Sequence, residues 1–202
     1  SLNLEKYDEW KDDPDMIGDV MRFLDNVLSD FINKAPEQFK DAKYSAERER
    51  SVGLGVMGFH SFLQKKRIPL ESVMAKSWNK KIFKNIHEKV NQASKDLAEE
   101  RGACPDAAEY GFKERFSNKT AIAPTASISI ICGGASPGVE PIAANSYTHK
   151  TLSGSFNVRN RYLEEILESH GKNDDETWST ITTNQGSVSH LDFLTDLEKD
   201  VF

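Results

Sequence analysis

The sequence predicts a helix-rich α/β fold, and three observations support this prediction. Two long stretches, residues 17–32 and 71–101, repeat apolar residues at the spacing of a helix. The short stretch Thr120–Ala123 is apolar and partly β-branched, which suits a buried strand. Residues 145–158 alternate polar with apolar or aromatic residues and contain glycine, as two strands joined by a tight turn do.

The first helix should begin at Asp13 and Pro14 and end near Lys34. Asp13 is a suitable cap, and Pro14 fits the first helical turn, where a missing N–H does no harm. The apolar stripe of this helix consists of Ile17, Val20, Met21, Phe23, Leu24, Val27, Leu28, Phe31 and Ile32. Asp25 and Asn26 lie off the stripe, so we interpret the acidic residues of the helix as a solvated face and not as a metal site.

A polar connection over residues 36–44 leads to residues 53–58, whose glycines fit the pattern Gly-x-Gly-x-x-Gly. Dinucleotide-binding folds carry this pattern, but they need a hydrophobic strand directly before it, and residues 46–50 are mostly charged. We therefore interpret the glycines as positions of close helix packing, with His60 at the helix surface. The side chains expected in the core are Val56, Phe59, Phe62 and Leu63.

Glycines mark the ends of two later helices. Gly102 would cap the long helix over residues 71–101, and Gly171 would close an amphipathic helix over residues 159–170. The stretch between Gly102 and the predicted strand is expected to be irregular.

Beyond Gly171 the sequence predicts a charged turn and one more helix. The turn covers residues 172–176, which are charged or polar. Ser189 is the expected cap of the final helix, since Asp192 stands three residues later and can complete a capping box.

Hydroxyl-bearing residues follow the predicted strand closely. Pro124 ends the strand because proline cannot donate a hydrogen bond to a sheet, and Thr125, Ser127 and Ser129 then precede Ile130. Serine or threonine at such a place commonly begins a helix, where unpaired N–H groups attract anions, phosphate above all. The segment is therefore either a helix cap without a ligand or an anion site that uses N–H groups and hydroxyls instead of Lys or Arg.

Composition narrows the class of protein. The 202 residues are 38% hydrophobic and 29% charged, which indicates a globular chain, and the net charge of −6 gives no basis for binding nucleic acid or an anionic membrane. No run approaches the length of a membrane span and the first residues are too acidic for a signal peptide, so we expect a cytoplasmic protein. Cys104 and Cys132 are too few for a disulfide framework or a zinc site, and we expect both to be reduced and structural.

Four motifs resemble the large, catalytic subunit of ribonucleotide reductase, in that family's order. Ser1–Leu4 resembles the end of a Cys-x-x-x-Ser-x-Asn-Leu segment, Arg50–Gly58 resembles Arg-x-x-Gly-x-Gly-x-x-Gly, and Arg101–Pro105 resembles another shared run. The longest match is residues 124–141. There Pro-Thr-Ala-Ser-Ile-Ser, followed by Gly-x-x-Ser-Pro-Gly-Val-Glu-Pro, resembles the family's substrate-phosphate loop.

The resemblance implies part of a ten-stranded α/β barrel. The subunit would be of the class I type and would reduce ribonucleoside diphosphates to deoxyribonucleotides by thiyl-radical chemistry. The substrate-binding residues that it implies are Pro124, Thr125, Ala126, Ser127 and Ile128. Hydroxyls of Thr125 and Ser127 and N–H groups of Ala126 and Ile128 would bind phosphate oxygens, while Pro124 fixes the direction of the chain.

The resemblance implies no catalytic residue within this piece. The family's redox cysteine would lie just before Ser1, its Asn-x-Cys-x-Glu finger loop is not among these residues, and its paired tyrosines and tail cysteines would follow Phe202. We therefore expect residues 1–202 to form a single partial domain of the barrel that is inactive alone and binds no metal or cofactor.

Cofactors and partners are implied for the whole subunit. The radical would come from a separate, metal-containing small subunit, the reductant would be thioredoxin or glutaredoxin, and ATP or dNTP effectors would bind elsewhere. The partners would be the diphosphate substrate, the remainder of the large subunit, the small subunit and a second large subunit.

Three alternatives remain. An adenosylcobalamin-dependent reductase carries a similar loop, usually with glycine where this chain has Ala126. The chain could instead be an orphan or split assembly module that completes another polypeptide's barrel. It could also be a nucleotide-binding helical module without enzymatic activity.

Overall fold

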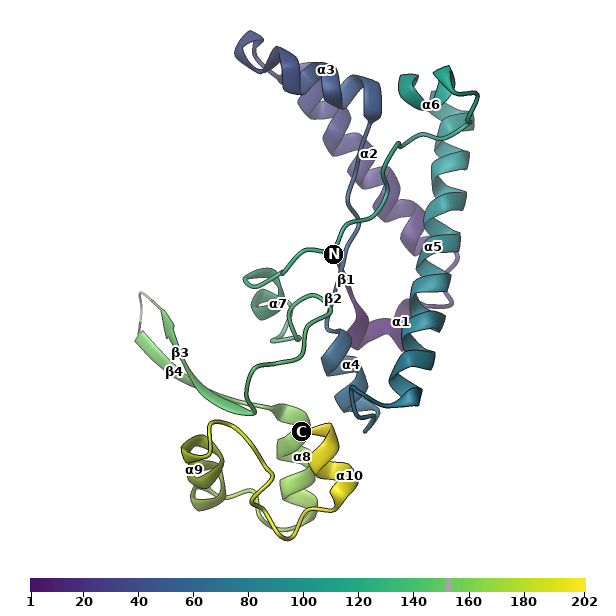
Figure 1. Cartoon of the computed structure of the whole chain (residues 1–202). Helices are drawn as coiled ribbons and strands as arrows, with labels where there is room; N and C mark the ends of the chain where they lie inside the picture. The colour runs from purple at the N-terminus through teal and green to yellow at the C-terminus, as the bar shows by residue number, and fades with distance from the viewer. Residues whose placement is uncertain (152–153) are drawn as a thin grey trace.

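The computed structural model describes the backbone of residues 1–151 and 154–202 and the side chains of residues 1–148 and 154–202. Figure 1 shows two long helices on one side, a protruding hairpin on the other and a small helical unit at the C-terminal end. Each helix in the described part is too short or too polar to cross a membrane. The elements in chain order are β1 (Leu2–Asn3), η1 (Leu4–Lys6), α1 (Tyr7–Trp10), α2 (Met16–Lys34), η2 (Glu37–Phe39), α3 (Lys40–Glu49), β2 (Val56–Met57), α4 (Phe59–Lys65), α5 (Val73–Arg101), α6 (Pro105–Glu109), α7 (Ile128–Ile131), β3 (Ser146–Thr151), β4 (Gly154–Arg159), α8 (Arg161–Ser169), α9 (Asp175–Thr183) and α10 (Asp196–Val201).

Three extended segments lie side by side and parallel near the middle of the molecule. β1 pairs with β2, with Leu2 opposite Val56. The stretch before β2 pairs on its other side with the stretch before the hydroxyl-rich loop, through a bridge between Leu54 and Thr120. The N–H of Leu54 donates to the carbonyl of Lys119 at 3.0 Å. Parallel pairing of segments separated by helices is the arrangement expected of an α/β fold.

The glycines of the Gly-x-Gly-x-x-Gly pattern lie in this sheet, so the prediction that they pack helices is wrong. A Cβ at Gly53 would lie 2.9 Å from the Cβ of Ala121, and one at Gly55 would lie 2.7 Å from the carbonyl oxygen of Ala121. Gly58 has φ of +78° and precedes α4 directly. These positions therefore allow close contact between extended segments and a sharp turn into a helix.

The main hydrophobic core joins the strands to the two long helices, α2 and α5, as predicted, but the stripe predicted for α2 is wrong at Phe23, Val27 and Phe31, which are exposed. The four side chains predicted to face the core after the glycine pattern are all buried, which confirms that part of the prediction. The buried residues of this core include Leu2, Leu4, Tyr7, Ile17, Met21, Leu54, Val56, Phe62, Leu63, Ile82, Ile86, Val90, Leu97 and Phe116. Asp13 accepts hydrogen bonds from the N–H groups of Asp15 and Met16 and so acts at the start of α2, as expected.

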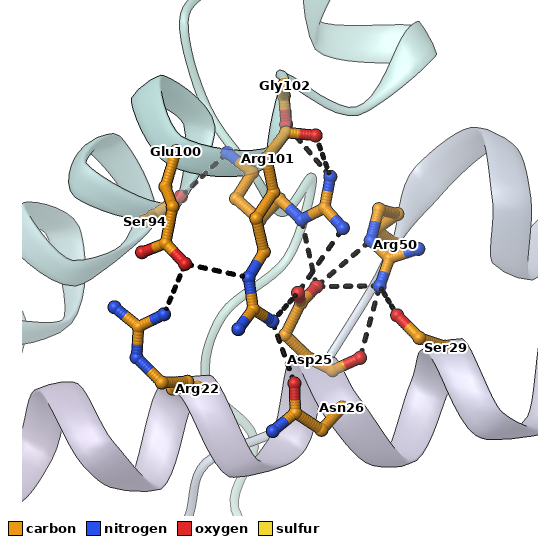
Figure 2. A network of polar contacts seen from close by, with 10 residues as sticks. Arg22, Asp25, Asn26, Ser29, Arg50, Ser94, Glu100, Arg101 and Gly102 are labelled. Carbon is orange, nitrogen blue, oxygen red and sulfur yellow. Dashed lines mark hydrogen bonds and ion pairs between the residues drawn. The ribbon is translucent and has the colours of Figure 1, made fainter.

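Asp25 on α2 is completely buried, so its interpretation as part of a solvated face is wrong. Its carboxylate accepts hydrogen bonds from Arg50, Arg101 and Arg115 at distances between 2.6 and 3.2 Å. Figure 2 shows Arg50 and Arg101 converging on Asp25 from different elements. Burial raises the pKa of Asp25, but the hydrogen bonds from Arg115, Arg101 and Arg50 outweigh it and hold this pKa below its usual value.

A second hydrophobic core lies in the C-terminal unit. Its buried residues are Leu163, Leu167, Trp178, Ile181, Val188, Leu191 and Leu194. Polar contacts attach this unit to α4 and η1. Gln64 donates to the carbonyl of Val201 at 3.2 Å, Arg67 donates to the carbonyl of Tyr162 at 2.7 Å, and the Tyr162 hydroxyl donates to Glu5 at 2.6 Å.

Three stretches predicted to lack a helix contain one, among them α6 in the stretch after Gly102 that was expected to be irregular, and the last helix begins later than predicted. α3 occupies part of the expected polar connection; it has no buried residue, so it carries no apolar stripe. α9 begins within the expected charged turn and contains four threonines, which have low helix propensity. α10 is capped by Thr195 and Glu198 in a capping box, not by Ser189. The hairpin β3–β4 confirms the strands predicted over residues 145–158.

We predict that Asp25→Ala lowers the free energy of unfolding of the chain by about 3–5 kcal/mol, since it leaves buried arginines without their counter-charge. The measurement is urea denaturation followed by tryptophan fluorescence. Asp30→Ala is the control, because Asp30 forms an exposed ion pair with Lys34 on the same helix. It should cost less than about 1 kcal/mol. Equal losses for the two variants would contradict the role assigned to Asp25.

Candidate functional site

The hydroxyl-rich loop, which we define as residues 125–138, leaves the sheet after Thr120. The predicted strand does not extend to Ala123, and Ile122 is 76% exposed. A strand needs hydrogen-bonding neighbours, and among the described residues this stretch has only the segment around Leu54 on one side. The prediction of a buried strand ending at Pro124 is therefore wrong beyond the bridge at Thr120.

Thr125 closes the loop on itself. Its φ of +53° lies in the left-handed region, which a β-branched residue rarely adopts. Its hydroxyl accepts a hydrogen bond from the N–H of Gly138 at 2.8 Å, and the residue is 7% exposed. Gly138 has φ of +50°, and a Cβ there would lie 2.8 Å from the carbonyl oxygen of Ala123. A strained backbone held by such contacts is typical of functional loops.

The donors of the loop lie directly after Thr125. Among the described residues, the N–H groups of Ala126, Ser127 and Ile128 have no hydrogen-bond acceptor, and the Ser127 hydroxyl has no partner. All three residues are exposed. Three consecutive free N–H groups beside a free hydroxyl can bind the oxygens of an anion without a charged side chain.

The helix predicted after these donors is a single turn, α7. Ser127 occupies the cap position without a side-chain hydrogen bond. A helix of four residues has only a small dipole, so its N–H groups themselves, and not a macrodipole, would attract an anion. The apolar side chains of this segment point to solvent, since Ile128, Ile130 and Ile131 are 50%, 53% and 83% exposed.

The loop returns to the N-terminal turn of α4. The carbonyl of Ser136 accepts from the N–H of Gly58 at 2.7 Å. Ser136 and Ser61 then exchange two hydrogen bonds, each hydroxyl accepting from the other residue's N–H, at 3.1 and 2.8 Å. No pattern in the sequence indicates a role for Ser61, and Ser136 stands out only as part of the motif over residues 124–141. Their contact joins two segments 75 residues apart, which no local pattern reveals.

His60 is 8% exposed, so its predicted place at the helix surface is wrong. Its Nδ1 accepts a hydrogen bond from the N–H of Ile142 at 3.2 Å, which requires the proton on Nε2. Burial lowers the pKa of His60 from 6.5 to about 4. The neutral imidazole thus attaches the segment after the loop to α4.

A pocket of about 230 Å³ lies beside the return half of the loop. It is lined in part by Gly133, Gly134, Gln64 and Arg161. Arg161 already forms an ion pair with Glu5. Because this cation is matched, the free donors after Thr125 are the better candidate for an anion site than the pocket.

The two cysteines differ. Both are free, as predicted, and Cys104 is fully buried. Cys132 is exposed at the end of α7, so the prediction that it has a structural role is wrong. Among the described side chains, which exclude those of residues 149–153, no group of three or more His, Cys, Asp or Glu could hold a metal ion.

Comparisons with known proteins agree on one family. The sequence matches the family described as "Ribonucleotide reductase, barrel domain" over residues 1–114 and 106–202. It is 49% identical over 206 residues to the ribonucleoside-diphosphate reductase large subunit of Invertebrate iridescent virus 6, covering all of this chain and 21% of that protein. It is 40% identical over 166 residues to a vitamin B12-dependent ribonucleoside-diphosphate reductase of Thermoplasma acidophilum, covering 76% of this chain and 21% of that protein.

The fold agrees with a solved structure of the same kind. The class Id ribonucleotide reductase alpha subunit of Actinobacillus ureae superimposes with a TM-score of 0.90 and 40% identity, over 99% of this chain and 36% of that one. This chain therefore spans about a fifth of the curated relatives named above and about a third of the structure.

We predict that the stability of the chain falls as the pH decreases from 6.5 to 4 partly because of His60. The unfolded state binds a proton on this imidazole below pH 6.5, whereas the folded state does so only near pH 4. The loss should reach up to about 3 kcal/mol. His60→Asn keeps an acceptor for Ile142 but does not titrate. The difference in unfolding free energy between the two proteins should therefore shrink at low pH, and a constant difference would contradict the prediction.

Proposed function

The chain belongs to the ribonucleotide reductase barrel-domain family, and we propose that it supplies the substrate-phosphate loop of a ribonucleoside-diphosphate reductase large subunit. The observation that carries this proposal is the row of free N–H groups at Ala126, Ser127 and Ile128, on a loop held in a strained conformation by Thr125. The related viral protein is named for a diphosphate substrate, which such donors suit.

In the proposed complex, the N–H groups of Ala126 and Ile128 and the hydroxyl of Ser127 bind phosphate oxygens. The Thr125 hydroxyl accepts from the N–H of Gly138, and its own O–H can still donate to a phosphate oxygen. Pro124 directs the chain into the loop. The binding energy gained at the phosphates places the ribose for reaction elsewhere in the barrel, which is an orienting role and not a chemical one.

We propose that the complete subunit, and not this chain alone, is active. Ile122, Ile128, Ile130 and Ile131 are all at least half exposed, which supports a surface covered by the remainder of the large subunit. The radical would come from a separate metal-containing small subunit, with thioredoxin or glutaredoxin as reductant and ATP or dNTP effectors bound elsewhere. Pairing of two large subunits and a cytoplasmic location belong to the same proposal.

We also propose that residues 1–202 form a single partial domain. The two hydrophobic cores would argue for separate units, but buried polar groups tie them together. Gln64 is 1% exposed and contacts both Val201 and Asn160, while Glu5 is 8% exposed and contacts Tyr162.

The adenosylcobalamin-dependent reductase is the second candidate, and the relative from Thermoplasma acidophilum is the observation that favours it. The higher identity to the viral subunit and the class Id structural match favour the two-subunit enzyme. Activity of the complete protein with adenosylcobalamin in place of a small subunit would make the adenosylcobalamin-dependent reductase the first candidate. Activity with neither would favour the non-catalytic assembly module.

We predict that Ser127→Ala in the complete subunit raises KM for the ribonucleoside diphosphate about 5-fold and changes kcat little, since one hydrogen bond to phosphate is lost. This variant is a cleaner test than a change at Thr125, whose hydroxyl also holds the loop. The control is Ser77→Ala, an exposed serine on α5. If Ser127→Ala and the control give the same KM as the unchanged enzyme, Ser127 does not bind the phosphates.

We predict that the isolated chain does not reduce ribonucleoside diphosphates. The measurement is deoxyribonucleotide formation in the presence of a small subunit and reductant, with the complete large subunit as positive control. Turnover by the isolated chain would show that the chemistry lies within these residues and would overturn the proposed division of roles.

A further inference from the structure

We propose that Ser61 and Ser136 are positioning residues that hold the phosphate loop in its binding conformation. The inference rests on the function proposed above for the loop. Neither side chain lies among the free donors, so both would act through the backbone that carries those donors.

α4 lacks a cap of its own. Its cap residue is Gly58, which has no side chain, and the first N–H groups of any helix have no acceptor within the helix. The N–H of Ser61, in the first turn, donates to the hydroxyl of Ser136 at 3.1 Å. Ser136 thus performs from the loop the capping role that serine usually performs from the preceding residue.

The pairing is reciprocal and buried. The hydroxyl of Ser61 accepts from the N–H of Ser136 at 2.8 Å, and the two residues are 4% and 0% exposed. The carbonyl of Ser136 also accepts from Gly58. Water cannot replace a lost partner at a fully buried site without rearrangement, so removal of one hydroxyl leaves an N–H unpaired.

The anchor connects to the donors within a few residues. Gly138, two positions after Ser136, donates to the Thr125 hydroxyl at 2.8 Å, and Thr125 immediately precedes the free N–H groups. The left-handed φ of Thr125 is unfavourable for threonine and persists only while its surroundings hold it. Fixing Ser136 on α4 therefore fixes Gly138, and Gly138 fixes the backbone at Thr125.

Loosening the anchor should weaken substrate binding more than the reaction. A loop that samples other conformations must be ordered when the diphosphate binds, which lowers the apparent affinity. Once the substrate is bound, the same donors place it in the same position, so kcat should change little. We expect Ser136→Ala in the complete subunit to raise KM about 5-fold, the effect of losing roughly one hydrogen bond.

Ser94→Ala is the matched control. Ser94 is also 0% exposed, and its hydroxyl also accepts from a distant backbone N–H at 3.1 Å, that of Arg115 in the Asp25 network. Both variants should lower the melting temperature of the complete subunit. Only Ser136→Ala should raise KM. Equal KM values for the two variants would overturn the inference, because the effect would then be general destabilisation or absent.

Two further variants keep the test decisive. Ser61→Ala removes the other half of the pair, and alanine favours the helix at this position, so it serves if Ser136→Ala does not fold. Its KM should rise similarly, and an unchanged KM counts against the inference.

Ser127→Ala distinguishes failure of this inference from failure of the proposed function. If it raises KM and the Ser61 and Ser136 variants do not, the loop binds phosphate without this anchor; if no variant raises KM, the proposed function fails as well.

Discussion

The close contact of two extended segments through Gly53 and Gly55 is the constraint on which the rest of the structure depends. Any larger residue at these positions would collide with Ala121. The contact allows the segment before β2 to pair with the segment before the loop, so that Leu54 lies opposite Thr120. Both segments then continue from this pairing in the same direction, one into α4 and the other into the loop. The start of α4 and the loop therefore meet.

The Asp25 network fixes where this sheet begins. Arg50 ends α3 in a left-handed conformation and starts the extended stretch that contains Gly53. Its guanidinium binds Asp25 on α2, while Arg101 and Arg115 approach the same carboxylate from the end of α5 and from the stretch that leads toward Thr120. One buried charge thus links both long helices to two of the three extended segments. Removing Asp25 should lower the free energy of unfolding by more than the network contributes to it, because the arginines would remain buried without their counter-charge.

Sequence reasoning succeeded where a pattern was long and repeated. α2, α5, α8 and the hairpin form where their residue patterns predict them, although Phe23, Val27 and Phe31 of the α2 stripe are exposed, and the family resemblance is confirmed by the comparisons. It failed where stability comes from distant contacts. α3 is anchored by ion pairs from Arg48 to Asp106 and Glu109 on α6, which no local period encodes. The buried positions of Asp25 and His60 were missed for the same reason, since their partners lie far away in the sequence.

In the candidate site, too, local sequence predicted the residues of the loop but not their contacts with distant residues. The loop from Thr125 to Ile128 was found from its residues, but the contact of Thr125 with Gly138 and the anchor between Ser61 and Ser136 were not.

A crystal structure of the complete subunit with a ribonucleoside diphosphate tests the central claim most directly. The account predicts phosphate oxygens at about 2.7–3.2 Å from the N–H groups of Ala126 and Ile128. A diphosphate bound elsewhere, with these groups still free, would contradict it.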